Sequence, residues 1–468
     1  MNTESSQYDV AILGSGPGGY VAAIKGNQLG LKVALVEKYI KFGGTCLHWG
    51  CVPTKSLLLN AELYEKARKG KEFGILYKNV RLDYSLVKAR KDKMVKKLSM
   101  GTDFLMKKNK IETYRGKGRL IAPGIIQIEG DEVNEIRAGK IIIATGSEAK
   151  LFPGLEPDGK TILTNKEILD LESVPKTLLV IGGGAVGVEF ASIFERFGTQ
   201  VTIVEMLPRI LPLEDHEISE EIRKLLTKRR IKILVNAKLE DIRVEDGSAH
   251  AKVSVVDGDI QDIVAEKALI AVGRQPVIEE LGLEKLRVET ARGFIPVDEN
   301  MQTSVRGIYA IGDVVPTQAL AHLASHEGMV AMEHIAKGST FPINYDLVPN
   351  CTYCSPEVAS VGLTENAARE KGLDVVTGKF PFAAVSKATI LGENEGFVKL
   401  VSEKKYQQIL GVHMVGPKVT ELIAAAAASI GLEATAADLS HLIHPHPTLS
   451  EGIMEAAHAL YSGAAIHI

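Results

Sequence analysis

The pattern of apolar and polar residues near the N-terminus predicts a strand, a glycine-rich turn, a helix and a second strand. These four elements are expected at residues 8–13, 14–19, 20–29 and 32–36. Three glycines of the turn, Gly14, Gly16 and Gly19, stand between the first strand and the helix, and the second strand ends at Glu37. This order is typical of one half of a dinucleotide-binding fold.

The same order of elements returns further along the chain. Its strand, turn, helix and strand are expected at residues 177–181, 182–187, 188–197 and 200–204. The distance from Gly14 to Glu37 and the distance from Gly182 to Glu205 are both 23 positions. One glycine-rich turn is weak evidence, but two copies with the same strands and the same acidic spacing predict two Rossmann halves in one chain.

The rest of the pattern suggests where domains begin and end. Apolar runs at residues 140–143 and 268–272 predict buried strands that lead into glycine, and the pattern changes to an α+β module after Pro349. We therefore expect an α/β fold with two Rossmann-like dinucleotide-binding domains, a central domain and a C-terminal α+β domain. The expected domains cover residues 1–148, 149–275, 276–346 and 347–468.

Composition excludes several classes of protein. The chain has 468 residues, of which 45% are hydrophobic and 24% charged, with a net charge of -3. These values are ordinary for a globular protein and give no sign of a nucleic-acid or anionic-membrane partner. Four cysteines do not make a disulfide scaffold. The N-terminus has no signal-peptide pattern and the apolar stretches are too short to span a bilayer, so we expect a cytoplasmic protein.

Each glycine of a dinucleotide-binding turn has a physical task. The first permits the tight turn, the second lets the phosphates approach, and the third lets the helix pack on the strand. In the second copy these are Gly182, Gly184 and Gly187. Glu37 and Glu205 stand where a carboxylate would bind ribose hydroxyls. A carboxylate repels a 2′-phosphate, so Glu205 favours NAD over NADP, and the nearby Arg209 is the residue that could reverse this preference.

Cys46 and Cys51 are candidates for a redox pair. Residues five apart in an ideal helix have Cα atoms about 8.7 Å apart, whereas a disulfide needs about 4.4–6.8 Å. A bridge therefore requires a distorted turn, which Gly50 and Pro53 would allow. Cysteine spacing alone leaves open the alternative of two inert buried thiols.

The segment that contains these cysteines carries a resemblance to a known family. Residues 43–55, GGTCLHWGCVPTK, resemble the redox-active segment of the FAD-dependent pyridine nucleotide–disulfide oxidoreductases. The likeness covers essentially the whole chain and includes both glycine-rich turns, residues 144–146, residues 307–313 and the segment 444–451. Within the family, the chain most resembles the members that oxidise dihydrolipoamide. His48 and Trp49 depart from the family pattern, and their effect is left open.

The resemblance implies a role for many single residues. Cys46 would be the interchange thiol that attacks the substrate, and Cys51 would form the thiolate next to the flavin. FAD would be bound by Gly14, Gly16, Gly19, Glu37, Gly44, Thr45, Lys55, Gly118, Thr145, Gly146, Asp313 and Ala321. NAD would be bound by Gly182, Gly184, Gly187, Glu205 and Gly273, and Glu189 would pair with Lys55.

The C-terminal histidines and the remaining cysteines complete the predicted site. His446 lies between two prolines and would be the acid–base group, held by Glu451. His444 is the rival, and Glu451 could instead simply cap a helix. In this family the histidine comes from the neighbouring subunit, which implies a homodimer. Cys351 and Cys354 form a CxxC pair that we interpret as structural, because no second such pair completes a metal site.

The resemblance thus predicts an NAD-dependent enzyme that oxidises protein-bound dihydrolipoamide. Its partners would be lipoyl-bearing proteins of 2-oxo acid dehydrogenase or glycine cleavage complexes. Family members that act on glutathione disulfide or on mercuric ion are alternatives within the class. The first would favour basic residues where Glu205 stands, and the second would carry C-terminal cysteines. A redox-inert dinucleotide-binding subunit is the alternative from another class.

Overall fold

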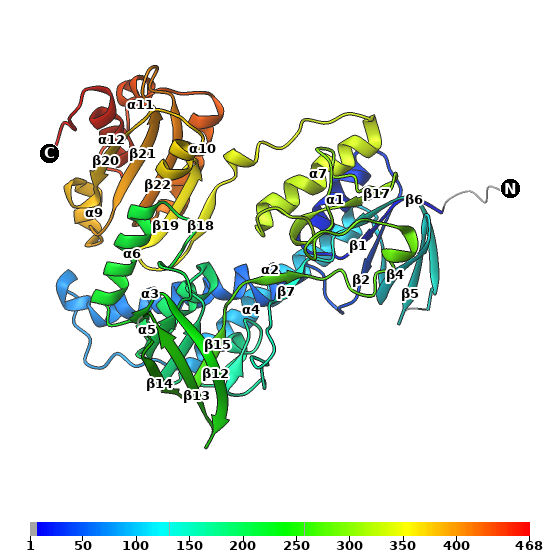
Figure 1. Ribbon diagram of the computed structural model, residues 1–468, viewed down its shortest axis with the longest axis horizontal. Coiled ribbons are helices and arrows are strands. Elements are labelled where there is room, and N and C mark those ends of the chain that lie inside the picture. The colour runs from blue at the N-terminus through cyan, green and yellow to red at the C-terminus, as the bar shows by residue number, and fades with distance from the viewer. Residues whose placement is uncertain (1–6, 131, 257) are drawn as a thin grey trace. The chain divides into compact units, whose positions relative to one another are not determined.

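The computed structural model describes residues 7–130, 132–256 and 258–468 (Figure 1). The chain forms two compact units. The first contains residues up to 56, residues 86–150 and residues 273–343, and the second contains residues 57–85, 151–272 and 344–468. Two long helices, α3 (Cys51–Arg68) and α4 (Tyr84–Lys108), each contain a boundary between the units.

The first unit is built on a seven-stranded sheet with the strand order β3-β2-β1-β6-β5-β4, in which β17 also pairs with β6. The strands are β1 (Tyr8–Leu13), β2 (Val33–Glu37), β3 (Glu112–Arg115), β4 (Lys117–Ala122), β5 (Ile125–Glu129), β6 (Glu135–Ile143) and β17 (Ile308–Ala310). The pairs of β1 with β2 and with β6 are parallel, as are those of β2 with β3 and of β17 with β6, whereas β4, β5 and β6 form an antiparallel meander. A small sheet pairs β7 (Ser147–Ala149) with β16 (Arg274–Pro276).

Both faces of this sheet are covered, which explains why β1 is almost continuously apolar. Val10 and Ile12 point into one buried cluster, and Ala11 and Leu13 point into another. Helices α1 (Pro17–Gln28) and α7 (Ala321–Lys337) pack against each other on the first of these faces, as Figure 1 shows. The unit also contains α2 (Gly44–Trp49) and the short 3-10 helices η3 (Glu284–Leu286) and η4 (Gly312–Val314).

The second unit contains the second Rossmann half. Its parallel sheet has the order β11-β10-β9-β15-β8, with β8 (Ile162–Leu163), β9 (Thr177–Ile181), β10 (Gln200–Val204), β11 (Lys232–Leu234) and β15 (Lys267–Ile270). Helices α5 (Ala185–Phe197) and α6 (His216–Lys228) follow β9 and β10. An antiparallel sheet of β12 (Ala237–Glu245), β13 (Ser248–Val255) and β14 (Ile260–Ala265) packs on the parallel sheet. Short 3-10 helices are η1 (Gly70–Phe73) and η2 (Ile168–Asp170).

The second unit also contains the C-terminal α+β module. Its antiparallel sheet has the order β18-β19-β22-β21-β20, with β18 (Asn350–Thr352), β19 (Glu357–Gly362), β20 (Val375–Pro381), β21 (Phe397–Glu403) and β22 (Ile409–Gly416). Helices α10 (Val419–Gly431) and α12 (Glu451–Tyr461) bury their apolar sides in its core. The shorter helices are α8 (Glu365–Glu370), α9 (Ser386–Leu391), α11 (Ala436–His441), η5 (Tyr345–Leu347) and η6 (Phe382–Ala384).

The predicted strands and helices are present, with small shifts at their ends. Helices α1 and α5 begin three residues earlier than predicted, directly after Gly16 and Gly184. Pro17 explains the early start of α1, because its fixed φ suits the first helical position. Residues 273–343 group with the N-terminal residues, so the four predicted domains stay a prediction. No helix in the described ranges is both long and apolar enough to span a membrane.

Candidate active site

The first glycine-rich turn has the shape of a phosphate cradle. Gly14 has a φ of +100°, and a Cβ there would overlap the carbonyl oxygen of Ala144. A Cβ at Gly19 would overlap the carbonyl oxygen of Gly14. By contrast, a Cβ at Gly16 would meet nothing within 4 Å. Gly16 is also the N-cap of α1 and has no side-chain cap, so the helix N-terminus presents backbone N–H groups to this open space.

The second turn repeats this arrangement. Gly182 has a φ of +107°, and its Cβ would overlap the carbonyl oxygen of Ala271. A Cβ at Gly187 would overlap the Gly182 carbonyl, and one at Gly184 would meet nothing within 4 Å. Each turn is therefore closed where protein packs on protein and open where an anion would bind. This geometry fits the tasks predicted for the three glycines, and their part in cofactor binding stays a prediction.

Glu37 is buried and bound by backbone amides. Its Oε2 accepts hydrogen bonds from the Ser15 N–H at 2.9 Å and the Ser15 hydroxyl at 2.6 Å. Its Oε1 accepts from the Tyr39 N–H at 2.8 Å. These bonds fix the carboxylate directly beside the turn, as the prediction for a ribose-binding group requires.

Glu205 is held in the same way in the second copy. Its Oε2 accepts from the Gly183 N–H at 2.6 Å and its Oε1 from the Leu207 N–H at 2.7 Å. Arg209, the residue that could favour a 2′-phosphate, donates from its guanidinium to the Pro212 carbonyl at 3.3 Å. The arrangement thus keeps a negative charge at the turn, which supports the preference for NAD.

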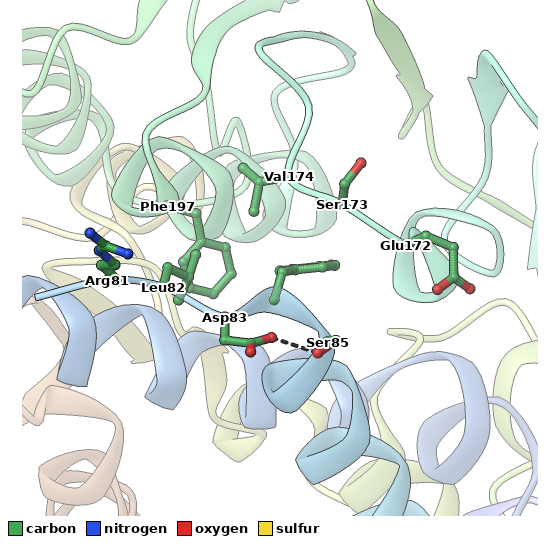
Figure 2. A pocket seen from close by; sticks show the side chains of 9 residues that line it. Arg81, Leu82, Asp83, Ser85, Glu172, Ser173, Val174 and Phe197 are labelled. Carbon is green, nitrogen blue, oxygen red and sulfur yellow. Dashed lines mark hydrogen bonds between the residues drawn. The ribbon is translucent and has the colours of Figure 1, made fainter.

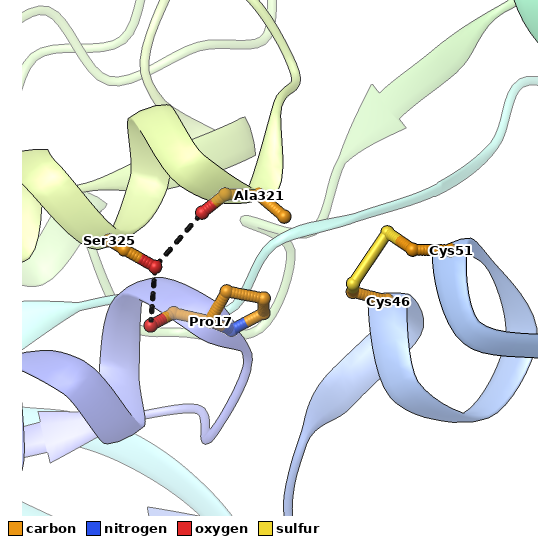
Figure 3. The surroundings of a disulfide bond; sticks show 5 residues. All are labelled: Pro17, Cys46, Cys51, Ala321 and Ser325. Carbon is orange, nitrogen blue, oxygen red and sulfur yellow. Dashed lines mark hydrogen bonds between the residues drawn. A yellow bond between two sulfur atoms is a disulfide. The ribbon is translucent and has the colours of Figure 1, made fainter. Parts of the chain in front are cut away.

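Cys46 and Cys51 form a disulfide, with Cα atoms 4.7 Å apart. Figure 3 shows Cys46 in α2 and Cys51 at the first position of α3. The chain leaves helical geometry at Gly50, whose φ and ψ are -143° and -112°. The break that the spacing predicts is therefore present, and it shortens the distance that a continuous helix would impose.

The redox segment lies against the first glycine-rich turn. A Cβ at Gly44, the first residue of α2, would lie 2.7 Å from the Cα of Gly16. The Gly43 N–H donates to the Ser15 carbonyl at 3.0 Å, which ties the start of the segment to the turn. The fold therefore brings the disulfide-bearing helix next to the predicted phosphate cradle of FAD, and Thr45 is the next residue of that helix.

His48 and Trp49, which depart from the family pattern, are both in contact with the segment after β2. The Nε2 atom of His48 lies 2.8 Å from the Phe42 carbonyl oxygen. The Trp49 and Tyr39 rings meet edge to face, with centroids 4.8 Å apart. Because the Tyr39 N–H binds Glu37, these rings join the redox helix to the carboxylate of the first Rossmann half.

Lys55 and Glu189 lie in different units. Lys55 is on α3, one helical turn after Cys51, where a cation favours the thiolate over the thiol. Glu189 is buried in α5 and accepts a hydrogen bond from the Tyr353 N–H at 2.9 Å. Their predicted pairing therefore stays a prediction.

Asp313 belongs to a polar cluster that the sequence pattern did not reveal in full. It accepts a hydrogen bond from the Ser147 hydroxyl, and the Nε of Arg274 lies 3.6 Å from its carboxylate. Arg274 also donates to the Ser147 hydroxyl oxygen at 2.6 Å. Burial lowers the pKa of the Arg274 guanidinium, and the nearby Asp313 opposes this shift. The fully buried Glu327 accepts from the Gly312 N–H at 2.6 Å and so fixes the residue before Asp313.

The other residues predicted near FAD are also in the first unit. Gly118 packs on the ends of β1 and β2, since a Cβ there would lie 3.1 Å from a Val36 methyl group. The Thr145 hydroxyl donates to the Val277 carbonyl at 2.6 Å, and Gly146 has open space around it. Ala321 begins α7, where Ser325 bonds to the carbonyls of Ala321 and of Pro17 in α1 (Figure 3). The part of these residues in FAD binding stays a prediction.

Gly273 is grouped with a different unit from the other residues predicted to bind NAD. It belongs to the first unit, where its carbonyl accepts a hydrogen bond from the Lys150 N–H at 3.0 Å. The turn at residues 182–187 and Glu205 belong to the second unit. The role of Gly273 therefore stays a prediction.

His446 and Glu451 form the predicted contact in the C-terminal module. The Nδ1 of His446 lies 2.8 Å from Glu451 Oε1. Glu451 Oε2 also accepts from the Thr448 N–H at 2.8 Å, so one carboxylate both caps the helix start and holds the imidazole. Although burial raises the pKa of the Glu451 carboxyl, the Thr448 amide and His446 hold it below its usual range. His444 instead bonds through Nδ1 to the Leu442 carbonyl, which leaves the carboxylate-bound His446 as the better candidate for the base.

The CxxC pair of the C-terminal module has a structural environment. Cys354 is buried, and its thiol lies 3.1 Å from the Pro356 carbonyl oxygen. Burial raises the pKa of the Cys354 thiol, which disfavours the reactive thiolate. Cys351 is partly buried. Neither cysteine belongs to a disulfide, and their structural role stays a prediction.

A separate open cavity of about 600 Å³ lies in the second unit, shown in Figure 2. It is lined by Arg81, Leu82, Asp83, Tyr84, Ser85, Glu172, Ser173, Val174 and Phe197. It contains none of the residues predicted for cofactor or substrate. Burial and the acidic Asp170 and Glu172 raise the pKa of the Tyr84 hydroxyl to about 12, so this ring stays neutral.

Two glycine-rich turns of this geometry, with a disulfide-bearing helix packed against the first, are typical of the class of flavoprotein disulfide oxidoreductases. The comparisons with known proteins agree. The family model for pyridine nucleotide-disulphide oxidoreductases matches residues 8–328, and the model for the dimerisation domain of the same family matches residues 348–457. The chain belongs to this family, which carries FAD and NAD as its cofactors and confirms the predicted fold class.

Individual relatives narrow the class. The chain is 47% identical to the dihydrolipoyl dehydrogenase of Bacillus subtilis, over 99% of this chain and 100% of that protein. It is 46% identical to the dihydrolipoyl dehydrogenase of Rhizobium etli, over 97% of this chain and 98% of that protein. Among solved structures, LpdA of Mycobacterium tuberculosis aligns with a TM-score of 0.88 at 26% identity, over 96% of this chain and 99% of the other. These findings bear out the predicted resemblance to dihydrolipoamide-oxidising members.

Proposed function

We propose that the protein oxidises dihydrolipoyl groups carried by partner proteins, with NAD as the final acceptor, as a homodimer in the cytoplasm. The observation that carries the proposal is the Cys46–Cys51 disulfide, which joins the start of α3 to α2, the helix that contacts the first glycine-rich turn. The chain is similar over nearly its full length to dihydrolipoyl dehydrogenases, which supports dihydrolipoyl groups as the substrate. The partners would be lipoyl-bearing proteins of 2-oxo acid dehydrogenase or glycine cleavage complexes.

The residues of the two turns fit dinucleotides. Gly16 and Gly184 leave open space at helix N-termini, and a side chain at either position would fill the place of a phosphate. Glu37 and Glu205 stand beside these spaces with both carboxylate oxygens fixed by backbone amides. FAD would be held by the first turn and by the Asp313 cluster, and NAD by the second turn. When bound, FAD supplies the two-electron acceptor between the cysteine pair and NAD.

The chain's own residues account for the dithiol half of the reaction. His446 accepts a proton from one substrate thiol, and the resulting thiolate attacks Cys46 and breaks the bond to Cys51. Cys51 is released as a thiolate, which the nearby Lys55 stabilises. The second substrate thiol then displaces Cys46, whose departing sulfur takes up the proton of that thiol, and the lipoyl disulfide closes. Together, the two cysteines have now gained the two electrons that the dithiol has lost.

Glu451 prepares His446 for this step. The ionised carboxylate accepts a hydrogen bond from the Nδ1–H group, which leaves Nε2 as the nitrogen that can take the thiol proton. The side chain of His446 is 69% exposed, so it can reach a site formed with a second subunit of a homodimer. The family dimerisation domain at residues 348–457 contains this histidine.

A steady-state assay tests the proposal. Dihydrolipoamide should reduce NAD much faster than NADP. Glutathione should not replace dihydrolipoamide as the reductant. A protein that instead oxidises NADPH with glutathione disulfide or with mercuric ion would contradict the proposed substrate. Failure to bind FAD would contradict the assignment of the first turn.

A further inference from the structure

Helix α12 carries a second carboxylate that holds a histidine. This carboxylate lies one helical turn after the one that holds the proposed base. Glu451 and Glu455 are four residues apart on this helix, and each accepts a bond from the Nδ1 of a histidine outside the helix. Glu455 Oε1 lies 2.6 Å from Nδ1 of His467, which is the penultimate residue of the chain. Residues at this spacing have Cβ atoms about 5–6 Å apart, so the two carboxylate–histidine pairs are neighbours.

The pair of Glu455 and His467 is also fixed by backbone hydrogen bonds. The Ile466 N–H donates to Glu455 Oε2 at 2.7 Å, and the His467 N–H donates to the same oxygen at 3.4 Å. The side chain of Glu455 is only 3% exposed, whereas that of His467 is 69% exposed. A buried carboxylate therefore fixes the end of the chain and presents a second imidazole on the surface.

Other charged and titratable groups lie on α12 itself and on the elements that pack against it, α11, β20 and β21. The charged side chains of strands β20 and β21, which pack against α12, are Lys379, Lys399 and Glu403. Both lysines bind Glu217, and Glu403 accepts from the amides of its own turn. The remaining titratable groups of α11 and α12 are Asp438, His441, His458 and Tyr461. Asp438 accepts from Thr435 in a capping box, and the rings of His441 and Tyr461 pack with centroids 5.2 Å apart.

We propose that His467 is a positioning residue of the dithiol reaction, which acts through its charge on the Glu451–His446 pair. This rests on the proposed function. A protonated His467 stabilises the ionised Glu451, which orients the His446 ring, and it disfavours a second positive charge on His446. The positive charge of His467 therefore favours the base form of His446.

The charge contacts agree with this direction. Burial raises the pKa of the Glu451 carboxyl, but the amide of Thr448, His446 and, more weakly, His467 lower it, and the lowering effects win. An imidazole changes its charge close to neutral pH. The influence of His467 should therefore depend on whether its ring carries a proton.

The holoenzymes of His467→Gln and His467→Lys variants test the proposal. For His467→Gln we expect kcat/KM for dihydrolipoamide to fall about two- to tenfold at about pH 6 and to equal the wild-type value at about pH 8.5. His467→Lys keeps a positive charge and should restore the acidic side of the profile. His458→Gln, which removes another imidazole from the same helix, should leave the profile unchanged. The difference should shrink at about 1 M salt, where charges are screened beyond about 3 Å.

The outcomes separate this proposal from the proposed function. A loss that is the same at both pH values, or a profile that His467→Gln leaves unchanged, would overturn it. If wild-type enzyme does not oxidise dihydrolipoamide, the proposed function fails. The pH midpoint of His446, measured by NMR on histidine-labelled holoenzyme, still tests the charge effect: it should move to higher pH in His467→Gln. An unmoved midpoint would overturn the inference without any activity measurement.

Discussion

The first and second Rossmann halves can be compared residue by residue, since corresponding positions such as Gly14 and Gly182 are 168 apart. In both, the acidic residue accepts from the amide of the turn's second residue, Ser15 or Gly183. In both, the chain returns six residues after the acid to donate an N–H to that residue's carbonyl, at 3.0 Å from Gly43 and 2.8 Å from Leu211.

The halves differ at this second residue and in the segment that comes after the return bond. The Ser15 hydroxyl donates to Glu37 at 2.6 Å, whereas a Cβ at Gly183 would lie 2.8 Å from a methyl group of Ile210. After Gly43 the chain forms the disulfide-bearing helix α2, but after Leu211 it runs to α6, whose N-cap is Asp215. The two halves thus share one backbone arrangement. They differ in the segment after the return bond, which carries the cysteine pair in the first half only.

Removing one of the two cysteines that are unique to the first half should have the largest effect. Cys46→Ser should lower dihydrolipoamide oxidation by at least about 10³-fold, as expected when a nucleophile is lost. Electron transfer from NADH to an artificial acceptor such as ferricyanide should persist, because it depends on the cofactor sites and not on the dithiol chemistry. Cys351→Ser is the matched control and should stay close to wild type. A Cys46→Ser enzyme that still oxidises the dithiol would refute the assignment of the first half.

His446→Gln should reduce dihydrolipoamide turnover by roughly 10²–10⁴, the usual range for a lost acid–base group. Reduction by NADH should change much less, since hydride transfer does not use this imidazole. His444→Gln, which removes a histidine bound only to a backbone carbonyl, is the control. An equal loss in both variants would show that the segment is needed for structure and not for proton transfer.

The corresponding acids should affect different cofactors. Glu205→Gln removes a charge near the second cradle and should raise the ratio of NADP to NAD use about tenfold, since one charge contact is worth about 1–2 kcal/mol there. Glu37→Gln should leave that ratio unchanged and speed the loss of FAD. Coenzyme kinetics and the rate of flavin release measure the two effects. If Glu37→Gln changes coenzyme preference, the two halves have been assigned in the wrong order.

The smallest effect is expected at the residue that distinguishes the two turns. Ser15→Ala should lower the free energy of unfolding by about 1 kcal/mol, through loss of the hydroxyl bond to Glu37. The reciprocal change, Gly183→Ser, should also destabilise the protein, because its Cβ would crowd Ile210. Denaturant unfolding followed by flavin and far-ultraviolet signals would measure both. A neutral Gly183→Ser would show that the glycine is not required by packing.

Much of this site was predictable, because local patterns encode it. The glycine turns, the acidic strand ends and the break at Gly50 each depend on residues close together in the sequence. The cluster around Asp313 was only partly predicted, since its partner Ser147 is 166 positions away and Arg274 comes from another strand. His467 was not predicted either, because a histidine near a chain end has no pattern until the helix that binds it is in place.

The contact between Trp49 and Tyr39 allows tryptophan fluorescence to report on this part of the protein. Trp49 is the only tryptophan of the chain and lies between the two cysteines, with its ring against the segment that holds Glu37. All tryptophan emission therefore comes from one residue, at the end of the disulfide-bearing helix α2. We expect this emission to be dim with FAD bound, brighter after FAD is removed and altered when the cysteines are reduced. FAD binding and the redox state of the cysteines could then be followed without any label.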